Sequence, residues 1–284
     1  MRFVKTRFSL LIFLTLNLSL SAQMLHPLPA DHKVEHQAYQ LDYNEQTEQA
    51  NWVFYEVTRA ELTGSLERSD NFRRDPKVRS LSAGPNDYRH SGYDRGHLAP
   101  AADMRFSSAA MSQCFYMSNM SPQSPGFNRG IWRSLEAQVR AWAYADGELY
   151  VVTGPLFIEL EGELSGGVDI PSHFFKVLLD WDGEELRTVA FVLPNAKSSR
   201  SLSFFEVPID EVERLSGFDF FSALPDSLET LVEAGTYGFW DYSLRYHAPS
   251  SDGSVAQQCK GQTQSGRRCR RRTKDPSGYC WQHR

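Results

Sequence analysis

Apolar and polar residues alternate along short stretches of the chain, a pattern typical of β-strands that are buried on one face. The segment 52–59 places Val53, Tyr55 and Val57 on one side of such a strand. Three further runs are short, rich in β-branched or aromatic residues and bounded by Gly, Pro or Asn: 149–153, 174–180 and 188–193. The pattern therefore predicts at least four core strands.

The apolar period changes to three and four residues between Asn128 and Ala145, which predicts an amphipathic helix. Its apolar face consists of Ile131, Trp132, Leu135, Val139 and Trp142. A second stripe of the same helix is charged and consists of Arg129, Arg133, Glu136 and Arg140. By contrast, the segment 64–92 is polar and rich in turn-forming residues, so we expect a long functional loop there.

The N-terminal segment 1–22 has the features of a secretory signal peptide. Three basic residues precede an apolar run from Phe8 to Leu20, and small residues follow it. This run has 13 residues, fewer than the roughly 20 needed to span a bilayer. We therefore expect no stable membrane anchor and a secreted or periplasmic protein after cleavage.

Charge divides the remaining chain into parts. The formal net charge is −5, but residues 23–258 carry −15 and the segment 259–284 carries +7. A polar stretch at 249–258 contains Ser, Asp and Gly and almost no apolar residue, as a linker does. We expect one large domain at 23–248, a linker at 249–258 and a small basic module at 259–284.

The segment 93–100 places Arg95 and His97 two residues apart with Gly96 between them. In an extended strand both side chains would point to the same face, so the arginine would hold a phosphate beside the imidazole. A lone histidine is more often structural than catalytic, and this segment alone does not decide between the two.

Two further polar residues lie on the predicted helix. Asn128 stands at its start, where the ordinary role of asparagine is to cap the helix. Glu136 lies between Arg133 and Arg140, and surface ion pairs would explain it equally well.

Taken together these residues match a known family. Residues 94–97 read Asp-Arg-Gly-His, and an ordered set follows within 43 residues: Pro100, Asn119, Pro122, Gln123, Asn128, Trp132, Leu135 and Glu136. This series resembles the DNA/RNA non-specific endonucleases of the ββα-metal type. The similarity extends from about residue 34 to about 245 and includes the run 171–176. It implies an α+β fold with a central antiparallel sheet flanked by helices.

The resemblance also implies roles for individual residues. His97 corresponds to the general base, and Asn128 to the side chain that binds the divalent cation, Mg²⁺ or Mn²⁺. Glu136 corresponds to a carboxylate that orients metal-bound waters. Asn119 corresponds to a second active-site amide, Arg95 to the motif arginine and Arg68 to an upstream active-site arginine, for which Arg73 and Arg74 are rivals. The implied substrates are DNA and RNA, cut to products ending in 5′-phosphate.

The chemistry of phosphodiester hydrolysis needs residues of these types. The anionic phosphate repels hydroxide, so the reaction needs neutralised charge, an aligned water and help for the leaving oxygen. Mg²⁺ prefers oxygen ligands and retains several waters, so one asparagine oxygen and a nearby carboxylate suit it. A neutral histidine accepts the proton of the attacking water.

The C-terminal module contains Cys259, Cys269, Cys280 and His283 in the pattern C-x9-C-x10-C-x2-H. Three thiolates and an imidazole form a closed tetrahedral Zn²⁺ site, which would stabilise a segment too short to have a core. Export favours disulfides instead, with Cys114 as an even fourth cysteine. The six basic residues around Cys269 predict either a solvated charge run or a nucleic-acid tether.

Two other functions fit parts of this pattern. The chain would be a non-catalytic nucleic-acid-binding protein if the motif residues were structural. It would be a nucleotide phosphodiesterase if the same scaffold accepted only small substrates.

Overall fold

The computed structural model describes most of the predicted large domain and parts of the C-terminal module. The described residues are 30–80, 82–181, 186–220, 222, 229–230, 233, 238–249, 257–262, 268–269, 272–273, 277–279 and 283. The predicted signal peptide at 1–22, most of the predicted linker and Cys280 lie outside these residues. Within the described part, no helix has the length and apolar character that crossing a bilayer requires.

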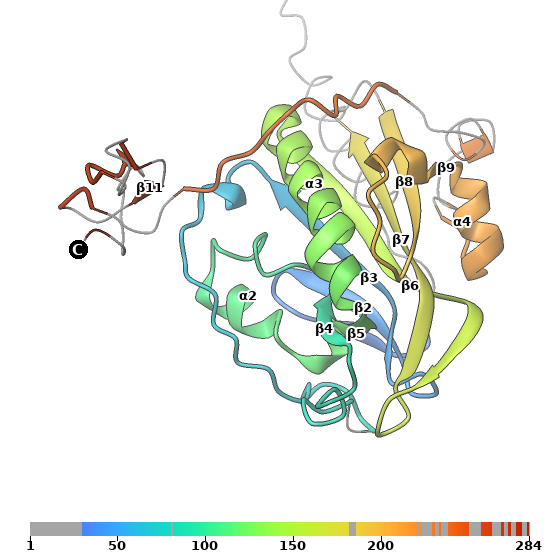
Figure 1. The fold of residues 1–284 in the computed structure, drawn as a ribbon. Helices are drawn as coiled ribbons and strands as arrows, with labels where there is room; N and C mark the ends of the chain where they lie inside the picture. The colour runs from blue at the N-terminus through green and yellow to red at the C-terminus, as the bar shows by residue number, and fades with distance from the viewer. Residues whose placement is uncertain are drawn as a thin grey trace, which may run out of the picture.

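A seven-stranded antiparallel sheet forms the centre of the molecule, in the order β1-β2-β3-β6-β7-β8-β9 (Figure 1). Its strands are β1 Lys33–Glu35, β2 Tyr39–Asn44, β3 Gln49–Thr58, β6 Glu148–Glu163, β7 Asp169–Trp181, β8 Leu186–Pro194 and β9 Glu206–Val207. The four predicted strands are confirmed as β3, β6, β7 and β8, and the antiparallel sheet with flanking helices is the α+β architecture expected.

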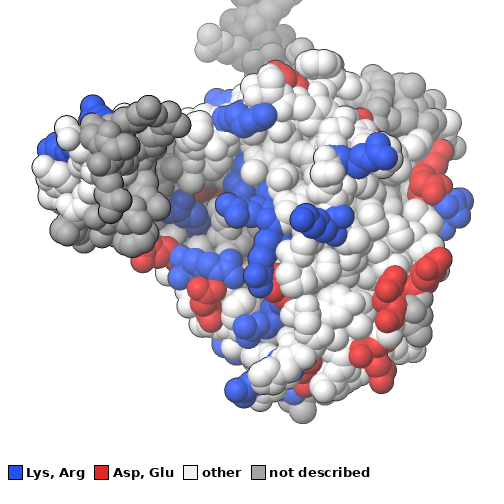
Figure 2. Space-filling view, in the orientation of Figure 1, with Lys and Arg blue, Asp and Glu red and all other residues white. Residues whose placement is uncertain are grey.

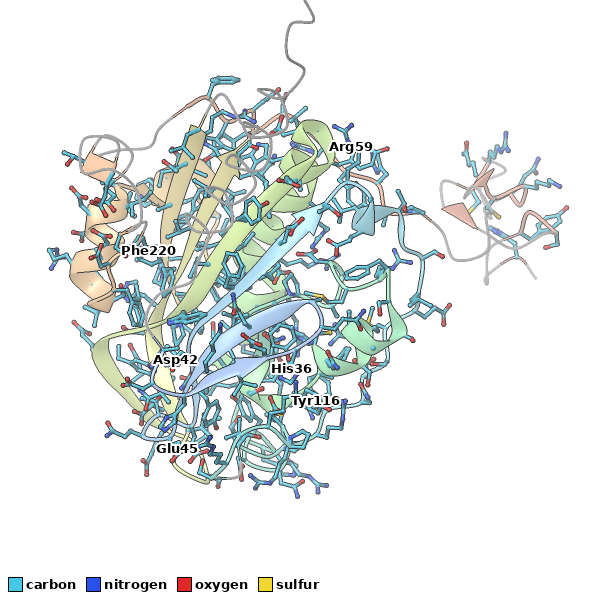
Figure 3. The ribbon with its side chains drawn as sticks, turned by 180° about the vertical axis from the view of Figure 1, so that it is seen from behind. His36, Asp42, Glu45, Arg59, Tyr116 and Phe220 are labelled. Atoms are coloured by element: carbon cyan, nitrogen blue, oxygen red, sulfur yellow. The ribbon has the colours of Figure 1, made fainter. Side chains whose placement is uncertain are left out.

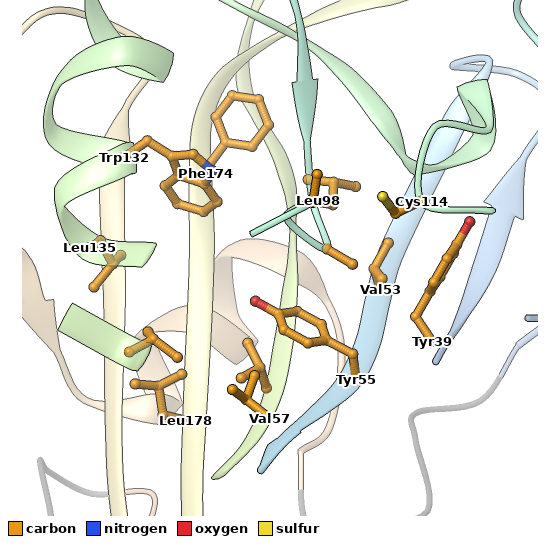
Figure 4. Close-up of a cluster of buried hydrophobic side chains, with 14 of the residues drawn as sticks. Tyr39, Val53, Tyr55, Val57, Leu98, Cys114, Trp132, Leu135, Phe174 and Leu178 are labelled. Carbon is orange, nitrogen blue, oxygen red and sulfur yellow. The ribbon is translucent and has the colours of Figure 1, made fainter. Parts of the chain in front are cut away.

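Alternating side chains give the sheet two apolar faces. Phe174 and Leu178 of β7 contribute to the larger core, which packs against α3 (Arg133–Asp146), and Trp132 and Leu135 point into it (Figure 4). Phe175 and Val177 of β7 face the other way and pack with α4 (Ile209–Ser216) in a second cluster. Full burial of each large apolar side chain contributes about 1.5–3 kcal/mol, so both helices are held to the sheet by their apolar faces.

The chain between β3 and β6 leaves the sheet and forms the layer that contains α3. It contains, in order, η1 Glu61–Thr63, β4 Asp94–His97, α2 Ser108–Gln113, η2 Met117–Asn119, β5 Met120–Gln123, η3 Phe127–Trp132 and α3. β4 and β5 form a separate antiparallel pair in which His97 faces Met120. The described residues of 64–92 contain no helix and no strand of a sheet, which confirms the predicted loop.

The predicted helix at 128–145 is present but is not continuous. η3 has π-helical hydrogen bonding, and Gly130 adopts non-helical angles, φ −107° and ψ −112°, before α3 begins. The residue at the N-cap of η3 is Gly126, so Asn128 does not cap the helix. π-Helical turns occur often at functional sites, where they turn a side chain out of helical register.

The structure contains several elements that the sequence analysis did not predict. The β1–β2 hairpin, α2 and α4 are short, and their apolar residues are too few to establish a period. The hairpin turn is fixed by His36, whose Nε2 lies 2.8 Å from Asp75 Oδ2 and whose ring lies 5.1 Å from that of Tyr116 (Figure 3). Asp75 therefore holds the long loop against the hairpin.

Candidate active site

His97 ends β4 in a buried position between two aromatic rings. The ring of Phe115 lies 4.9 Å away, edge to face, and that of Phe72 lies 5.9 Å away. The buried Nε2 has no hydrogen-bond partner in the described residues. Burial, together with the charges of Arg68 and Arg95, lowers the pKa of His97 to about 3. The imidazole is therefore neutral at physiological pH and retains a lone pair that can accept a proton.

Two arginines lie on the aromatic rings beside His97. The guanidinium of Arg95 stacks 4.1 Å from the ring of Phe72, and that of Arg68 stacks 4.7 Å from the ring of Phe115. As predicted for an extended segment, Arg95 and His97 share a face of β4, since both contact Phe72. The two guanidiniums are exposed beside the imidazole, where they can bind a phosphate.

Of the three candidate arginines in the loop, only Arg68 lies beside His97. Arg73 stacks 3.9 Å from the ring of Tyr116, and Arg74 approaches Asp87 at 3.8 Å. Basic side chains gather along a hollow in the surface near the C-terminal module (Figure 2). A groove of about 490 Å³ there has a lining that includes Leu66, Arg68, Ala101, Arg105 and Met111.

Asn119 is completely buried and braces the strand that carries His97. Its Oδ1 accepts a hydrogen bond from the backbone N–H of Ala99 at 2.9 Å. Its Nδ2 donates to the backbone oxygens of Ala99 and Cys114, both at 2.9 Å. The amide is thus engaged with the backbone on both sides and joins the residues that follow β4 to the end of α2.

Asn128 of η3 points toward the beginning of β4. Its Nδ2 donates to Asp94 Oδ2 at 2.9 Å, and no described residue donates to its Oδ1. The guanidinium of Arg129 forms a bidentate pair with the same carboxylate, at 2.8 and 2.5 Å. Asp94 therefore fixes the orientation of the amide and leaves its oxygen available as a ligand for a hard cation.

Glu136 of α3 faces a buried group of charges. Neither Arg133 nor Arg140 forms an ion pair with it in the described residues; Arg140 pairs with Asp103 at 2.8 Å. Burial raises the pKa of Glu136 to about 7, although the charges of Arg140 and Lys176 oppose this rise. The simple surface ion pair considered from the sequence is therefore not what the structure contains.

Lys176 is the residue that the sequence analysis did not assign. It is fully buried on the β7 face that packs against α3, with Nζ 4.7 Å from the ring of Trp132 and 3.4 Å from the hydroxyl of Tyr55. Burial lowers its pKa to about 8, while the charges of Glu136 and Asp103 act in the opposite direction. A lysine within the apolar run 174–179 was the available signal, since a buried lysine needs a compensating charge.

Comparison with known proteins agrees with this arrangement. The family model described as DNA/RNA non-specific endonuclease matches residues 23–227. The protein belongs to this family. Nuclease C1 of Cunninghamella echinulata var. echinulata is 39% identical over 209 residues, which cover 67% of this chain and 83% of that protein.

Two further similarities extend the comparison. Mitochondrial endonuclease G of Homo sapiens is 38% identical over 200 residues, which cover 65% of this chain and 67% of that protein. The crystal structure of the EndoG/EndoGI complex contains a chain with 31% identity and a TM-score of 0.67, covering 72% of this chain and 92% of that one. The protein is therefore a nuclease of the hydrolase class.

Gly96 of the nuclease allows β4 to approach the side chain of Gln123. A Cβ at Gly96 would lie 2.2 Å from the Gln123 side chain, so any larger residue would displace it. The amide atoms of Gln123 are buried and have no hydrogen-bond partner in the described residues. The close neighbour of Gly96 is thus a side chain of the nuclease itself.

The C-terminal module of the nuclease brings together Cys259, Cys269 and His283. Their ligand atoms lie within 4.8 Å of one another, and Cys259 Sγ is 3.4 Å from His283 Nδ1. The N–H of Gly261 donates to Cys259 Sγ at 3.3 Å, and a Cβ at Gly261 would clash with the His283 ring. Among the described residues of the module, the two cysteines form the only buried apolar cluster.

Cys114 belongs to the main hydrophobic core and not to the cysteine–histidine group of the C-terminal module. It is a free thiol, fully buried in the main core, and donates to the backbone oxygen of Met111 at 3.2 Å. Burial raises the pKa of Cys114 to about 12, which leaves it protonated and unreactive. Cys114 is thus a buried thiol, and the structure does not favour it as the fourth disulfide partner.

Proposed function

We propose that this nuclease is a Mg²⁺-dependent endonuclease that hydrolyses DNA and RNA without strong sequence preference. The observation that supports this proposal most is the arrangement along β4: Asp94 orients Asn128 at one end, and His97 holds a neutral imidazole at the other. A cation ligand and a proton acceptor thus lie on one short strand. The same arrangement would act on duplex or single strands because it addresses the phosphodiester and not the bases.

The residues present fit a hard divalent cation. Asn128 offers an amide oxygen with its nitrogen already engaged, and Glu136 offers a half-buried carboxylate on the next turns of the helix. Mg²⁺ and Mn²⁺ accept such oxygen donors and complete their shells with water. When bound, the cation supplies positive charge that stabilises the developing charge of the phosphate and of the leaving oxygen.

The other side chains have separate tasks in the proposed reaction. Arg68 and Arg95 bind the phosphate, and its negative charge offsets the two cations that lower the pKa of His97. The imidazole then becomes a stronger base and takes a proton from the attacking water. Asn119 keeps the end of β4 in place, and Glu136 orients waters at the cation site.

The test is digestion of linear duplex, circular plasmid, single-stranded DNA and ribosomal RNA, each with and without Mg²⁺. We expect cleavage of all four only with the cation, and linearised plasmid identifies internal cutting. Activity confined to small diesters would favour the nucleotide phosphodiesterase, and binding without cleavage would favour the non-catalytic protein.

We infer that the C-terminal module binds Zn²⁺ through Cys259, Cys269 and His283, with Cys280 expected from the sequence as the fourth ligand. Support comes from the convergence of the three donor atoms and from the N–H···S bond of Gly261, which stabilises a thiolate. The basic residues of the module would tether nucleic acid and offset the acidic main domain. Metal analysis is the test: we expect one zinc per chain, whereas a disulfide-linked module would contain none.

We also propose that the nuclease is exported and that the segment 1–22 is removed. Support comes from the charge and apolar pattern of that segment. Fractionation of cells expressing the full chain, followed by N-terminal sequencing, is the test. A protein retained inside with an intact N-terminus would contradict the proposal.

A further inference from the structure

Acidic side chains converge on the sheet face opposite the active site. Asp210 and Glu213 project from α4, and Asp219 follows this helix. Glu229 and Glu233, both in helical conformation, follow further along the chain. Carboxylate oxygens gather over α4 on the side of the molecule that carries Phe220 (Figure 3), and acidic residues line the same edge in Figure 2.

Two groups of three carboxylates share Glu233. One contains Asp210 and Glu213, the other contains Asp219 and Glu229. Within each group the ligand oxygens lie within 4.8 Å of one another. Two oxygens bound to one Ca²⁺ at about 2.4 Å are separated by no more than about twice that length, so each group meets the geometric condition for one ion.

Glu233 is the most buried carboxylate of this cluster. Only 9% of the residue is exposed, and its buried Oε1 has no hydrogen-bond partner in the described residues. Among the residues that the structure describes, no ion pair involves Glu233, and Arg214 of α4 pairs with Glu211. A buried carboxylate directed into other carboxylates is unfavourable unless a cation joins them.

We propose that Asp210, Glu213, Asp219, Glu229 and Glu233 bind a hard divalent cation of the calcium type, with Glu233 shared by the two halves of the site. Every donor is a carboxylate oxygen, which suits Ca²⁺ and not the softer metals that prefer nitrogen or sulfur. Ca²⁺ accepts six to eight oxygens in flexible geometry, whereas Mg²⁺ requires a compact octahedron at about 2.0–2.1 Å. A spread of up to 4.8 Å favours the larger ion.

This site is structurally separate from the proposed catalytic one. α4 packs through Ile209 and Val212 against Phe175 and Val177, on the sheet face turned away from α3. The ion would join α4 to the helical segment that carries Glu229 and Glu233. Its role would be to hold this edge of the sheet, and nuclease chemistry does not require it.

The experiment uses the full chain, stripped with EDTA and titrated with Ca²⁺ alone by calorimetry and by thermal unfolding. We expect saturable binding and a rise in Tm in the wild type, and the same in Asn128→Ala, which alters the proposed catalytic cation ligand. In Glu233→Gln we expect binding at least tenfold weaker and little Ca²⁺-dependent rise in Tm. Without Ca²⁺ this variant should unfold at the same or a higher temperature, because repulsion is reduced.

Glu211→Gln is the matched control, since Glu211 lies on the same helix but pairs with Arg214 outside the cluster. It should bind Ca²⁺ as the wild type does. Equal affinity in Glu233→Gln and the wild type would overturn the proposal, as would loss of all Ca²⁺ binding in Asn128→Ala. If Glu233→Gln does not fold, Glu213→Gln and Asp219→Asn each remove one ligand from one half, and unchanged affinity in both would also overturn it.

Discussion

Asn128 donates its side-chain N–H to Asp94 at 2.9 Å, so the residue that would hold the cation is itself held by the strand that carries His97. Removal of this support should disturb the cation site without removing its ligand. We expect Asp94→Ala to raise the Mg²⁺ concentration for half-maximal activity about 10- to 100-fold, the usual effect of losing a group that orients a ligand.

The matched control is Arg129→Ala, which removes the exposed partner of the same carboxylate. It should raise the Mg²⁺ requirement less, because the bond from Asn128 persists. Equal Mg²⁺ titrations for Asp94→Ala and the wild type would show that Asp94 does not support the cation site.

His97→Ala should abolish most cleavage while substrate binding is retained. General-base catalysis typically contributes about 10²- to 10⁴-fold in rate, and the phosphate contacts of the two arginines do not involve the imidazole. Single-turnover cleavage and DNA binding without Mg²⁺ are the two measurements. A variant that retains a tenth of the wild-type rate at neutral pH would not have lost its base.

The acid limb of the pH profile should belong to Glu136 and not to His97. The pKa of Glu136 is raised to about 7 and that of His97 is lowered to about 3, so the carboxylate takes up a proton first as the pH falls. At limiting Mg²⁺, kcat/KM should decrease below about pH 7. More Mg²⁺ should move this limb to lower pH, because the cation favours the ionised carboxylate.

In Glu136→Gln this limb should disappear, and the rate at neutral pH should fall less than in Asn128→Ala, since Glu136 orients waters without binding the ion. Persistence of the same limb in Glu136→Gln would assign it to another group.

Lys176→Met should destabilise the fold through charge imbalance. The wild-type group of Lys176, Glu136, Asp103 and Arg140 is neutral, and loss of one member leaves a buried negative charge uncompensated. We expect the free energy of unfolding to fall by about 3 kcal/mol. The double variant Lys176→Met, Glu136→Gln should regain much of this stability, and denaturation at pH 8 measures the free energy of unfolding of both variants. Additive losses would show that Lys176 and Glu136 do not interact.

Deletion of residues 251–284 should leave cleavage of short oligonucleotides almost unchanged and weaken binding to long DNA. The deleted segment contains the +7 block of residues 259–284. Each phosphate neutralised contributes about 0.9 to the slope of log K against log salt, so the truncated enzyme should have a flatter salt dependence. An unchanged slope would indicate that the module does not bind nucleic acid.

The core strands were predictable because their apolar residues have the period that burial on a sheet requires. The family was predictable because an ordered set of residue types stands at fixed spacing. The break at Gly130 was not, since neither glycine nor the apolar period distinguishes a kinked helix from a regular one. The ion-pair partner of Arg140 was not predictable either. Glu136 is close to Arg140 in the sequence, but Asp103 is the carboxylate that pairs with it in the structure.

The proposed catalytic residues all lie in the part of the chain that joins β3 to β6, two strands that are direct neighbours. Thr58 at the start of this connection is the register partner of Glu148 at its end, so the connecting segment begins and ends at the same place in the sheet. The loop-closure entropy of such a connection grows slowly, by about 0.6 kcal/mol for each doubling of length. The segment 64–92 can therefore gain or lose residues at little cost to the sheet, which gives this part of the chain freedom to vary in length between related nucleases.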